Sequence, residues 1–271
     1  MSDIDDESLP VRFLRSQGRR AMSAMDHVGA VALLTGRTLR SLFTTRFEAR
    51  SFLYQVEQIG VNSFGIAAAT AVFVGIVMAI QFAFSLERFG ARDSVGRIVG
   101  LSEARELAPS LTALVVGSRI GAGIAAELGS MAVTEQIDAI RALGADPVKK
   151  LVVPRMLAGI VIMPMLTVFA FVLGTVSAAI VCNISFGIQI PFFITSALDS
   201  VWVQDFLSGL GKTPFFGFLI AMLGCHFGMS TRGGTEGVGR STTTSVVAVA
   251  ISVLVADSVL TQLFLSLLRT P

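Results

Sequence analysis

Long apolar stretches without a charged residue dominate this chain. They cover residues 61–86, 156–198 and 213–231, and the stretch 241–268 carries only Asp257. A helix needs roughly 20 apolar residues to cross the hydrocarbon core of a bilayer. A membrane barrel would instead alternate apolar and polar residues along each strand. The pattern therefore predicts an all-α fold, a polytopic membrane protein with five transmembrane helices at about 61–86, 107–130, 156–184, 213–231 and 246–268.

The segment between the third and fourth expected spans is more polar. Residues 186–211 contain Pro191 and the polar residues Asp199, Gln204 and Asp205. We interpret this segment as a loop with a short helix outside the bilayer.

Small residues recur at four-residue spacing in two of the expected spans. The two sets are Gly117, Gly121 and Ala125, and Gly65 and Ala69. Small residues at this spacing let helix backbones approach closely in lipid. We expect both sets to lie at helix–helix contacts.

The first 60 residues form a different kind of segment. Residues 1–8 are acidic and are expected to be disordered, whereas residues 9–60 mix eight arginines with scattered apolar residues. Such a mixture is typical of an amphipathic helix that lies at a membrane surface. An ordinary soluble helical arm is the alternative. We therefore divide the chain into an interfacial arm, residues 1–60, and a five-span domain, residues 61–271.

The basic residues are unevenly distributed among the segments outside the spans. The arm has eight, the 131–155 loop has four and the 232–240 loop has two, whereas 185–212 has only Lys212. Cytoplasmic loops of membrane proteins carry an excess of Lys and Arg. This distribution predicts a cytoplasmic N-terminus and an external C-terminus.

Composition adds little about partners or redox chemistry. Charged residues make up 15% of the chain and the net charge is +2, whereas soluble proteins carry about 25% charged residues. We expect no nucleic-acid partner. Cys182 and Cys225 both lie in apolar stretches and show neither metal-ligand spacing nor a disulfide framework. No metal or cofactor site is predicted.

The sequence SGLGKT at residues 208–213 resembles the end of a phosphate-binding loop. That motif also needs a glycine five positions before the Gly-Lys pair, and this chain has Phe206 there. The segment precedes Pro214 and an apolar stretch, not the helix of a soluble nucleotide-binding sheet. We therefore expect the chain to be non-catalytic, with any ATP hydrolysis carried out by a partner.

The 131–155 loop has the features of a short helix at about residues 134–144. Thr134 can cap its N-terminus, and the acidic residues Glu135 and Asp138 suit the positive end of the helix dipole. Gly144 and Pro147 can end it. Ile137, Ile140 and Leu143 form an apolar ridge flanked by charge, Arg141 included, that suits docking into a groove of a partner. A tight turn without a partner is the alternative.

Five ionisable residues lie unusually far into the expected spans or at their outer ends. They are Arg105, Glu106, Arg119, Lys212 and Asp257. Such residues usually face a cavity or a partner, because a charge in the bilayer centre costs about 2.5–3.5 kcal/mol.

Structural roles are the alternative for several of them. Glu106 then favours a helix N-terminus, and Lys212 reaches toward the headgroups. For Arg119 we favour a structural role, in which it pairs with Glu127 or a backbone carbonyl. His226, in the fourth span, is expected to be packed or to face a pore.

Three sequence blocks resemble the MlaE/YrbE family of permeases. They are RELAPSLTALVVGSRIGAGIAAELGSMAVTEQIDAIRALGADPVKKLVVPR at 105–155, GGTEGVGRSTTTSVV at 233–247 and VADSVLTQLF at 255–264. The resemblance extends over about residues 50–268.

The resemblance implies a function and a set of partners. Members of this family are membrane subunits of ABC transporters that move phospholipids or other lipids between the bacterial inner membrane and the outer envelope. It implies a homodimeric core, two ATPase subunits docked at the loop 134–147, MCE-domain proteins on the periplasmic side and often a small STAS-domain protein. Whether a close paralogue replaces the second copy stays open.

The resemblance also implies which residues take part in transport. The charged positions important for lipid transport match Arg105, Glu106, Lys212 and Asp257. We expect Arg105 and Lys212 to meet phosphate, and Glu106 and Asp257 to balance their charge. An ion- or proton-coupled carrier that uses Asp257 and Glu106 as a relay is the alternative function.

Overall fold

The computed structural model describes residues 9–44 and 48–268, and this part of the chain is helical with no strand. Five helical segments in it are long and apolar enough to cross a membrane: Ala49–Glu87, Arg92–Val133, Val148–Phe186, Val203–Met229 and Gly234–Leu267. The predicted all-α, five-span fold is confirmed. The disorder expected for residues 1–8 concerns residues outside those described.

Several spans combine α-helix with short π-helical or 3₁₀ segments. In chain order the elements are α1 (Leu9–Thr44), α2 (Ala49–Val56), η1 (Glu57–Val61), α3 (Asn62–Glu87), η2 (Arg92–Ser94), α4 (Val95–Ser102), η3 (Glu103–Leu111), α5 (Thr112–Val133), α6 (Gln136–Ala142), η4 (Val148–Val152), α7 (Val153–Phe186), α8 (Ile190–Ser200), α9 (Val203–Met229) and α10 (Gly234–Leu268).

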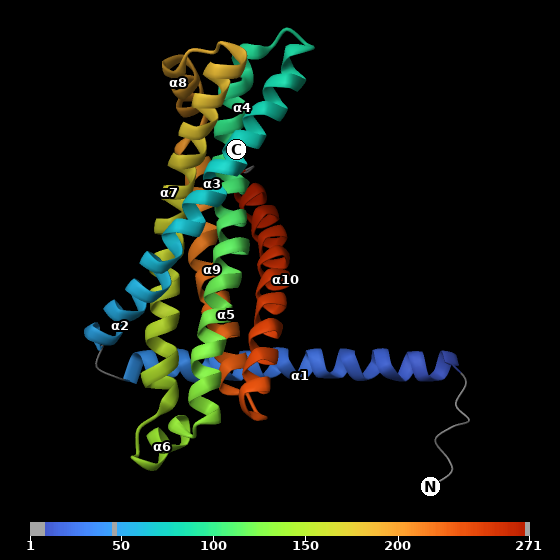
Figure 1. Ribbon diagram of the computed structural model, residues 1–271, viewed down its shortest axis with the longest axis vertical. Helices are drawn as coiled ribbons and strands as arrows, with labels where there is room; N and C mark the ends of the chain where they lie inside the picture. The colour runs from blue at the N-terminus through green and yellow to red at the C-terminus, as the bar shows by residue number, and fades with distance from the viewer. Residues whose placement is uncertain (1–8, 45–47, 269–271) are drawn as a thin grey trace.

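The long helix α1 runs across the bundle close to the end that carries α6 (Figure 1). Val31, Leu34 and Leu42 on its C-terminal half pack against the main apolar core. Its earlier part extends away from the bundle, with Met22 and Met25 exposed. A helix that runs across the spans and packs against them through its C-terminal half has the course expected of an amphipathic arm along a membrane surface.

Small residues bring the spans together, although not all at the predicted positions. Gly117 and Gly121 of α5 lie against Ile220 and Val249, as expected. The second predicted set is wrong, because a side chain at Gly65 would meet nothing within 4 Å. The buried set on α3 is instead Ser63, Ala67, Ala71, Gly75, Ala79 and Ala83.

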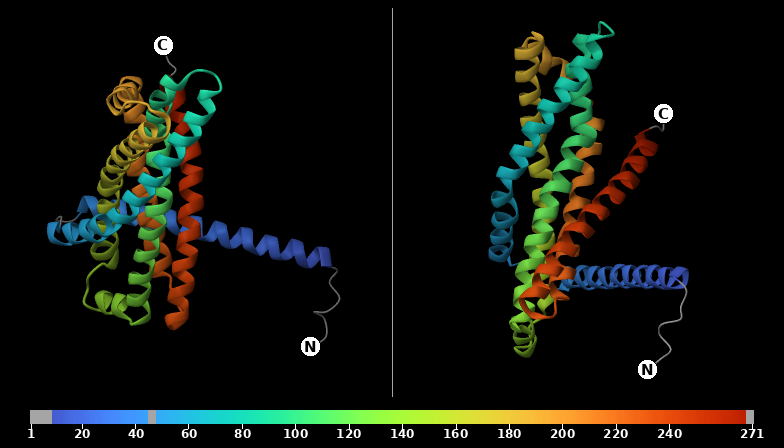
Figure 2. Two further views of the ribbon diagram at one scale, coloured as in Figure 1. Left: turned by 45° about the horizontal axis from the view of Figure 1, so that its top comes forward. Right: turned by 45° about the vertical axis from the view of Figure 1, so that its right-hand side comes forward.

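The contact between α3 and α7 shows how close this packing is. A Cβ atom added at Gly75 would lie 2.3 Å from the carbonyl oxygen of Gly174. Only a residue without a side chain fits there, so the two backbones touch directly. The apolar face of α10, by contrast, is largely uncovered, and α10 leans away from the other spans toward its C-terminal end (Figure 2).

The segment 186–211 is more helical than we expected. Helix α8 is the short helix predicted there, and it packs against α4 at the end of the bundle opposite α6 (Figure 1). The rest is not a loop, because α9 already begins at Val203. Asp205 stabilises this early start, since its Oδ2 atom accepts a hydrogen bond from the backbone N–H of Trp202 at 3.2 Å. Lys212 therefore lies about two and a half helical turns inside α9 rather than at its beginning.

Candidate functional site

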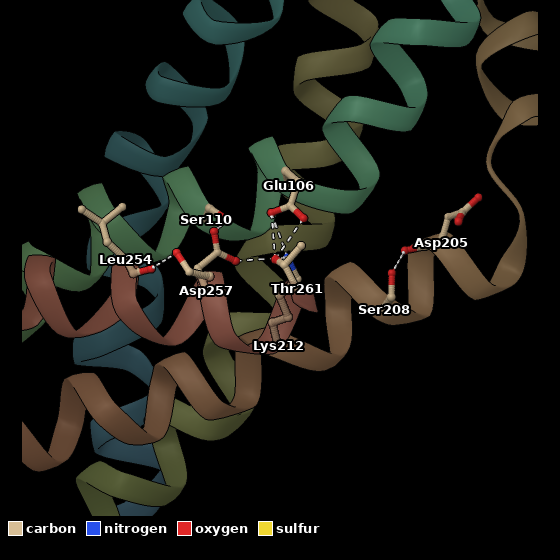
Figure 3. Close-up of polar contacts among 9 residues, drawn as sticks. Glu106, Ser110, Asp205, Ser208, Lys212, Leu254, Asp257 and Thr261 are labelled. Atoms are coloured by element: carbon tan, nitrogen blue, oxygen red, sulfur yellow. Dashed lines mark hydrogen bonds and ion pairs between the residues drawn. The ribbon is translucent and has the colours of Figure 1, made fainter. Parts of the chain in front are cut away.

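Lys212 lies at the centre of a polar cluster in the half of the bundle away from α6. Its Nζ atom lies 2.8 Å from Glu106 Oε2, 3.1 Å from Asp257 Oδ1 and 2.7 Å from Thr261 Oγ1. These partners come from η3 and α10, so the cluster joins three spans (Figure 3). Lys212 itself is only 2% exposed.

The ammonium group of Lys212 has no hydrogen-bond donor to spare. A protonated lysine carries three N–H donors, and each faces one of the three oxygen partners above. A buried cation is tolerated when it is paired and fully hydrogen-bonded. Direct binding of another anion by Lys212 therefore requires that one present partner be displaced.

The π-helical segment η3 positions the acidic partner. Pro109 lies within it and has no backbone N–H, so it cannot complete an ordinary α-helical ladder. Widened π-helical turns are frequent at functional sites. Glu106 and Ser110 of this segment both reach the cluster, and Ser110 Oγ donates a hydrogen bond to Asp257 Oδ2 at 2.7 Å (Figure 3).

Arg105, next to Glu106, forms an ion pair with an acidic residue outside the Lys212 cluster, Asp205. Its Nε and Nη2 atoms lie 2.9 and 2.5 Å from Asp205 Oδ1. Asp205 is buried, whereas the Arg105 side chain is 41% exposed. The expected convergence of four residues is therefore observed for Lys212, Glu106 and Asp257, while Arg105 forms a neighbouring ion pair.

A cavity of about 160 Å³ lies beside the cluster. Its polar wall includes Arg105, Glu106 and Lys212, and Phe264 and Leu265 of α10 provide the apolar wall. An amphiphile suits such a wall better than a fully polar or fully apolar solute, because each part of it meets a matching surface.

Neither of the two partners expected for Arg119, Glu127 or a backbone carbonyl, is bonded to it among the described residues. Arg119 instead donates a hydrogen bond from Nη1 to the hydroxyl of Ser63 at 2.7 Å. Glu127 pairs with Arg155, whose Nη2 atom lies 2.7 Å from its Oε1 atom. Arg155, which we assigned to a loop, is buried near the start of α7. The pairing was mispredicted because the alternative partners lie far away in sequence and meet only through helix packing.

His226 is packed, as one of our two alternatives stated. Its Nε2 atom lies 3.0 Å from Nδ1 of His27, and the two rings meet edge to face. This contact links α9 to α1. His27 carried no recognisable signal in the sequence, because only the fold places it beside His226.

The helix predicted at about 134–144 is present as α6, with two corrections. Thr134 does not cap it: its hydroxyl donates a hydrogen bond to the carbonyl of Ser130 in α5, and Glu135 takes a left-handed conformation before the helix. Ile137 is buried and does not belong to an exposed ridge. Leu143 is 86% exposed, and Gly144, with φ +75°, ends the turn as expected.

The charged residues of α6 and of its N-terminal flank lie on the exposed surface of the protein. Glu135, Asp138 and Arg141 are exposed, and Arg141 Nη1 lies 2.7 Å from Asp138 Oδ1. Ile140 is half-buried. The exposed surface of α6 therefore combines three charged residues with Leu143.

Sequence reasoning missed a buried acid in η3. Glu103 lies between α3 and α7, close to Gly174, and its Oε1 atom has no hydrogen-bond partner among the residues that the structure describes. Because it precedes Arg105 in a charged stretch that we placed outside the second span, it carried no sign of burial. The helix in fact begins at Val95, so Glu103 lies well inside it.

Comparison with known proteins points to one family. Residues 52–263 match the family model described as "Permease MlaE". The "Protein TRIGALACTOSYLDIACYLGLYCEROL 1, chloroplastic" of Arabidopsis thaliana is 37% identical over 235 residues, which cover 87% of this chain and 67% of the relative. A "Probable ABC transporter permease protein" of Rickettsia felis is 35% identical over 249 residues, which cover 92% of this chain and 96% of the relative.

A third relative has the same description. The "Probable ABC transporter permease protein slr1045" of Synechocystis sp. is 38% identical over 234 residues, which cover 86% of this chain and 89% of the relative. The matched region covers the second to fourth spans completely and most of the first and fifth, together with α6 and the charged cluster around Lys212. This chain therefore belongs to the MlaE permease family and is a multi-pass membrane permease.

Proposed function

We propose that this permease is the membrane subunit of an ABC transporter that moves phospholipid between the bacterial inner membrane and the outer envelope. Two relatives are named ABC transporter permeases, and the Arabidopsis relative is named after trigalactosyldiacylglycerol, a lipid. ATP is hydrolysed by a separate subunit, and this chain has no catalytic role of its own.

The observation that carries the lipid assignment is the charged cluster beside a mixed cavity. Lys212, Glu106 and Asp257 lie within helices long enough to span a bilayer, next to a wall formed by Phe264 and Leu265. Charges at such a place are costly unless they serve a cavity or a transported group. A phospholipid has both the charge and the apolar chains that this cavity would meet.

Within this proposal Arg105 is the first ligand of the lipid phosphate. Its guanidinium is partly exposed and directs only Nε and Nη2 to Asp205, so donors remain for an anion. Lys212 joins only when the phosphate displaces one of its partners. When no lipid is bound, Glu106 and Asp257 balance the charge of Lys212, and Asp205 balances that of Arg105.

The exposed surface of α6 is the proposed contact with the ATPase. Glu135, Asp138 and Arg141 surround Leu143 there, and Ile140 lies partly accessible beside them. A short helix with one apolar anchor and a charged rim suits a groove on a partner. Ile137 contributes indirectly, by fixing α6 to the bundle.

The proposed assembly is a homodimer in the bacterial inner membrane with a cytoplasmic N-terminus. Two copies of the permease bind two ATPase subunits, an MCE-domain protein on the periplasmic side and, in some systems, a STAS-domain protein. The uncovered apolar face of α10 leaves a surface for a second copy. The basic residues of the arm and of the loop around α6 favour the proposed orientation.

Reconstitution tests this function directly. The permease is placed in proteoliposomes with and without its ATPase, and the movement of a fluorescent phospholipid is followed after ATP addition. The proposal requires transport that depends on ATP and on the ATPase. Transport by the permease alone, or transport without ATPase that stops when the membrane potential is removed, would instead indicate an independent or ion-coupled carrier.

A further inference from the structure

A second polar groove lies nearer the α6 end of the bundle. It separates the Tyr54–Asn62 segment from α5 and has a volume of about 380 Å³. Its polar lining consists of Tyr54, Gln55, Gln58, Asn62, Arg119 and Glu127. It shares no lining residue with the cavity beside Lys212. Along the span formed by η3 and α5, Arg119 lies about 14 Å beyond Ser110 of the Lys212 cluster at roughly 1.5 Å per residue, so the two sites are distinct.

The groove is polar where a lipid-facing surface would be apolar. Arg119, Gly123 and Glu127 follow each other at four-residue spacing on α5, and Gln58 and Asn62 do so on the facing segment. Residues at this spacing share one face of a helix. Arg119, Glu127 and Asn62 lie within the expected spans, whereas Gln55 and Gln58 belong to the arm that leads into the first span. Because hydrocarbon does not solvate the charged groups inside the spans, this part of the groove needs a polar occupant.

The lining has unused hydrogen-bonding capacity that suits an anion. Arg119 is held at the groove by the single bond from Nη1 to the buried Ser63, and no other described residue bonds to its Nε or Nη2. Gln55 is 6% exposed, and its amide has no hydrogen-bond partner among the described residues. The one acid, Glu127, is neutralised by Arg155.

Gly123 keeps the groove open between Arg119 and Glu127. A Cβ atom added there would meet nothing within 4 Å, so neither close helix packing nor a positive φ requires a glycine. A larger side chain at this position would project into free space in the groove. The position therefore offers a way to fill the groove without a clash in the bundle.

We propose that this groove binds the phosphate of a phospholipid headgroup, with Arg119 as the charged ligand and Gln55 as a neutral one. The inference deepens the proposed function and rests on it. The exposed apolar residues Leu53 and Val61 lie beside the polar residues in sequence and provide a surface for the acyl chains. The groove and the Lys212 cavity then form two successive positions for a headgroup along the same bundle.

Photo-crosslinking of the permease–ATPase complex tests this inference. The complex is placed in nanodiscs that contain a phosphatidylglycerol with a photoreactive headgroup, and crosslinked peptides are mapped by mass spectrometry. We expect labelling within 54–62 and 119–127, reduced roughly tenfold by Arg119→Gln, which loses a charge-assisted hydrogen bond. Gly123→Leu should reduce it similarly, whereas Gly65→Leu, also on an open surface, should not.

Control experiments distinguish the groove from the Lys212 cavity, and a lipid headgroup from free inorganic phosphate. Excess inorganic phosphate should leave the labelling unchanged, and competition by it would show that the groove takes a free anion. Labelling at the Lys212 cavity without labelling of the groove would overturn this inference and leave the proposed function intact. If the wild-type complex shows no ATP-driven lipid transport, both this inference and the proposed function are overturned. The thermal stability of each variant is measured in parallel, so that a fall in labelling is read only from folded protein.

Discussion

Gly209 of α9 lies directly against the carbonyl oxygen of Ala104 in η3, where an added Cβ atom would approach that oxygen to 2.0 Å. This contact sets the distance between α9 and η3, and therefore between Lys212 and Glu106. It also gives a structural role to the first glycine of the SGLGKT sequence. The glycine serves helix packing rather than phosphate binding.

Gly209→Ala should separate η3 from α9, because backbone atoms cannot move aside as a flexible side chain can. We expect a loss of about 1–3 kcal/mol in stability, as for other overpacked sites, together with reduced lipid transport. Thermal unfolding in detergent measures the first effect. Gly65→Ala, at a position with free space around it, is the matched control, and equal stability of the two variants would contradict the proposed contact.

Lys212→Met should destabilise the bundle strongly. It leaves Glu106 and Asp257 close together without a cation, and breaking a buried pair costs about 3–5 kcal/mol. Neutralising all three residues, as Lys212→Met with Glu106→Gln and Asp257→Asn, should restore most of the stability but not lipid transport. Unfolding temperatures of the single and triple variants provide the comparison. A triple variant as unstable as the single one would show that charge balance does not explain the cluster.

Arg105→Gln should reduce lipid transport and also lower stability somewhat. The Arg105 side chain is partly exposed, but its loss leaves the buried carboxylate of Asp205 without its cation, so transport is compared at a temperature where the variant stays folded. If Arg105 binds the lipid phosphate, transport should fall roughly tenfold or more, because a hydrogen bond to a charged group is lost. Phospholipid copurified with the complex, quantified by mass spectrometry, reports binding. If this variant has normal lipid content and normal transport, Arg105 does not bind the lipid phosphate.

Leu143→Asp should weaken binding of the ATPase without unfolding the permease. Leu143 is largely exposed at the end of α6, so a charge there does not enter the protein core. It changes only the surface that the ATPase would contact. Copurification of the ATPase with the tagged permease measures the effect. Phe89→Asp is the control, since Phe89 is 82% exposed in the turn between α3 and η2 and lies outside α6.

Ile137→Asp should act differently, because Ile137 is buried and its charge would be placed in the core. We expect this variant to lose thermal stability as well as the ATPase. If Leu143→Asp retains the full amount of ATPase, then α6 is not the docking surface, whatever the behaviour of Ile137→Asp.

Hydrophobic pattern was sufficient to predict the five spans, whereas the short helix α6 was predicted from apolar spacing together with capping, dipole and glycine signals, of which the Thr134 cap was wrong. Apolar length and the cost of burying charge act locally along the chain, so the uncharged stretches reveal where helices cross. The same reasoning singled out Glu106, Lys212 and Asp257, which do meet. It placed the start of α9 too late, because Asp205 and Lys212 are charged residues whose ion-pair partners on η3 and α10 make them acceptable within a helix.

Which residues pair was decided only by the packing of the helices. Arg119 contacts Ser63 instead of Glu127, Arg105 turns to Asp205, and the close-packed small residues of α3 are those in register with Gly75 rather than Gly65. Each of these outcomes depends on how far one helix is rotated and shifted against another. Neither quantity is encoded in local periodicity, because all faces of a membrane helix are apolar and many rotations bury similar surface.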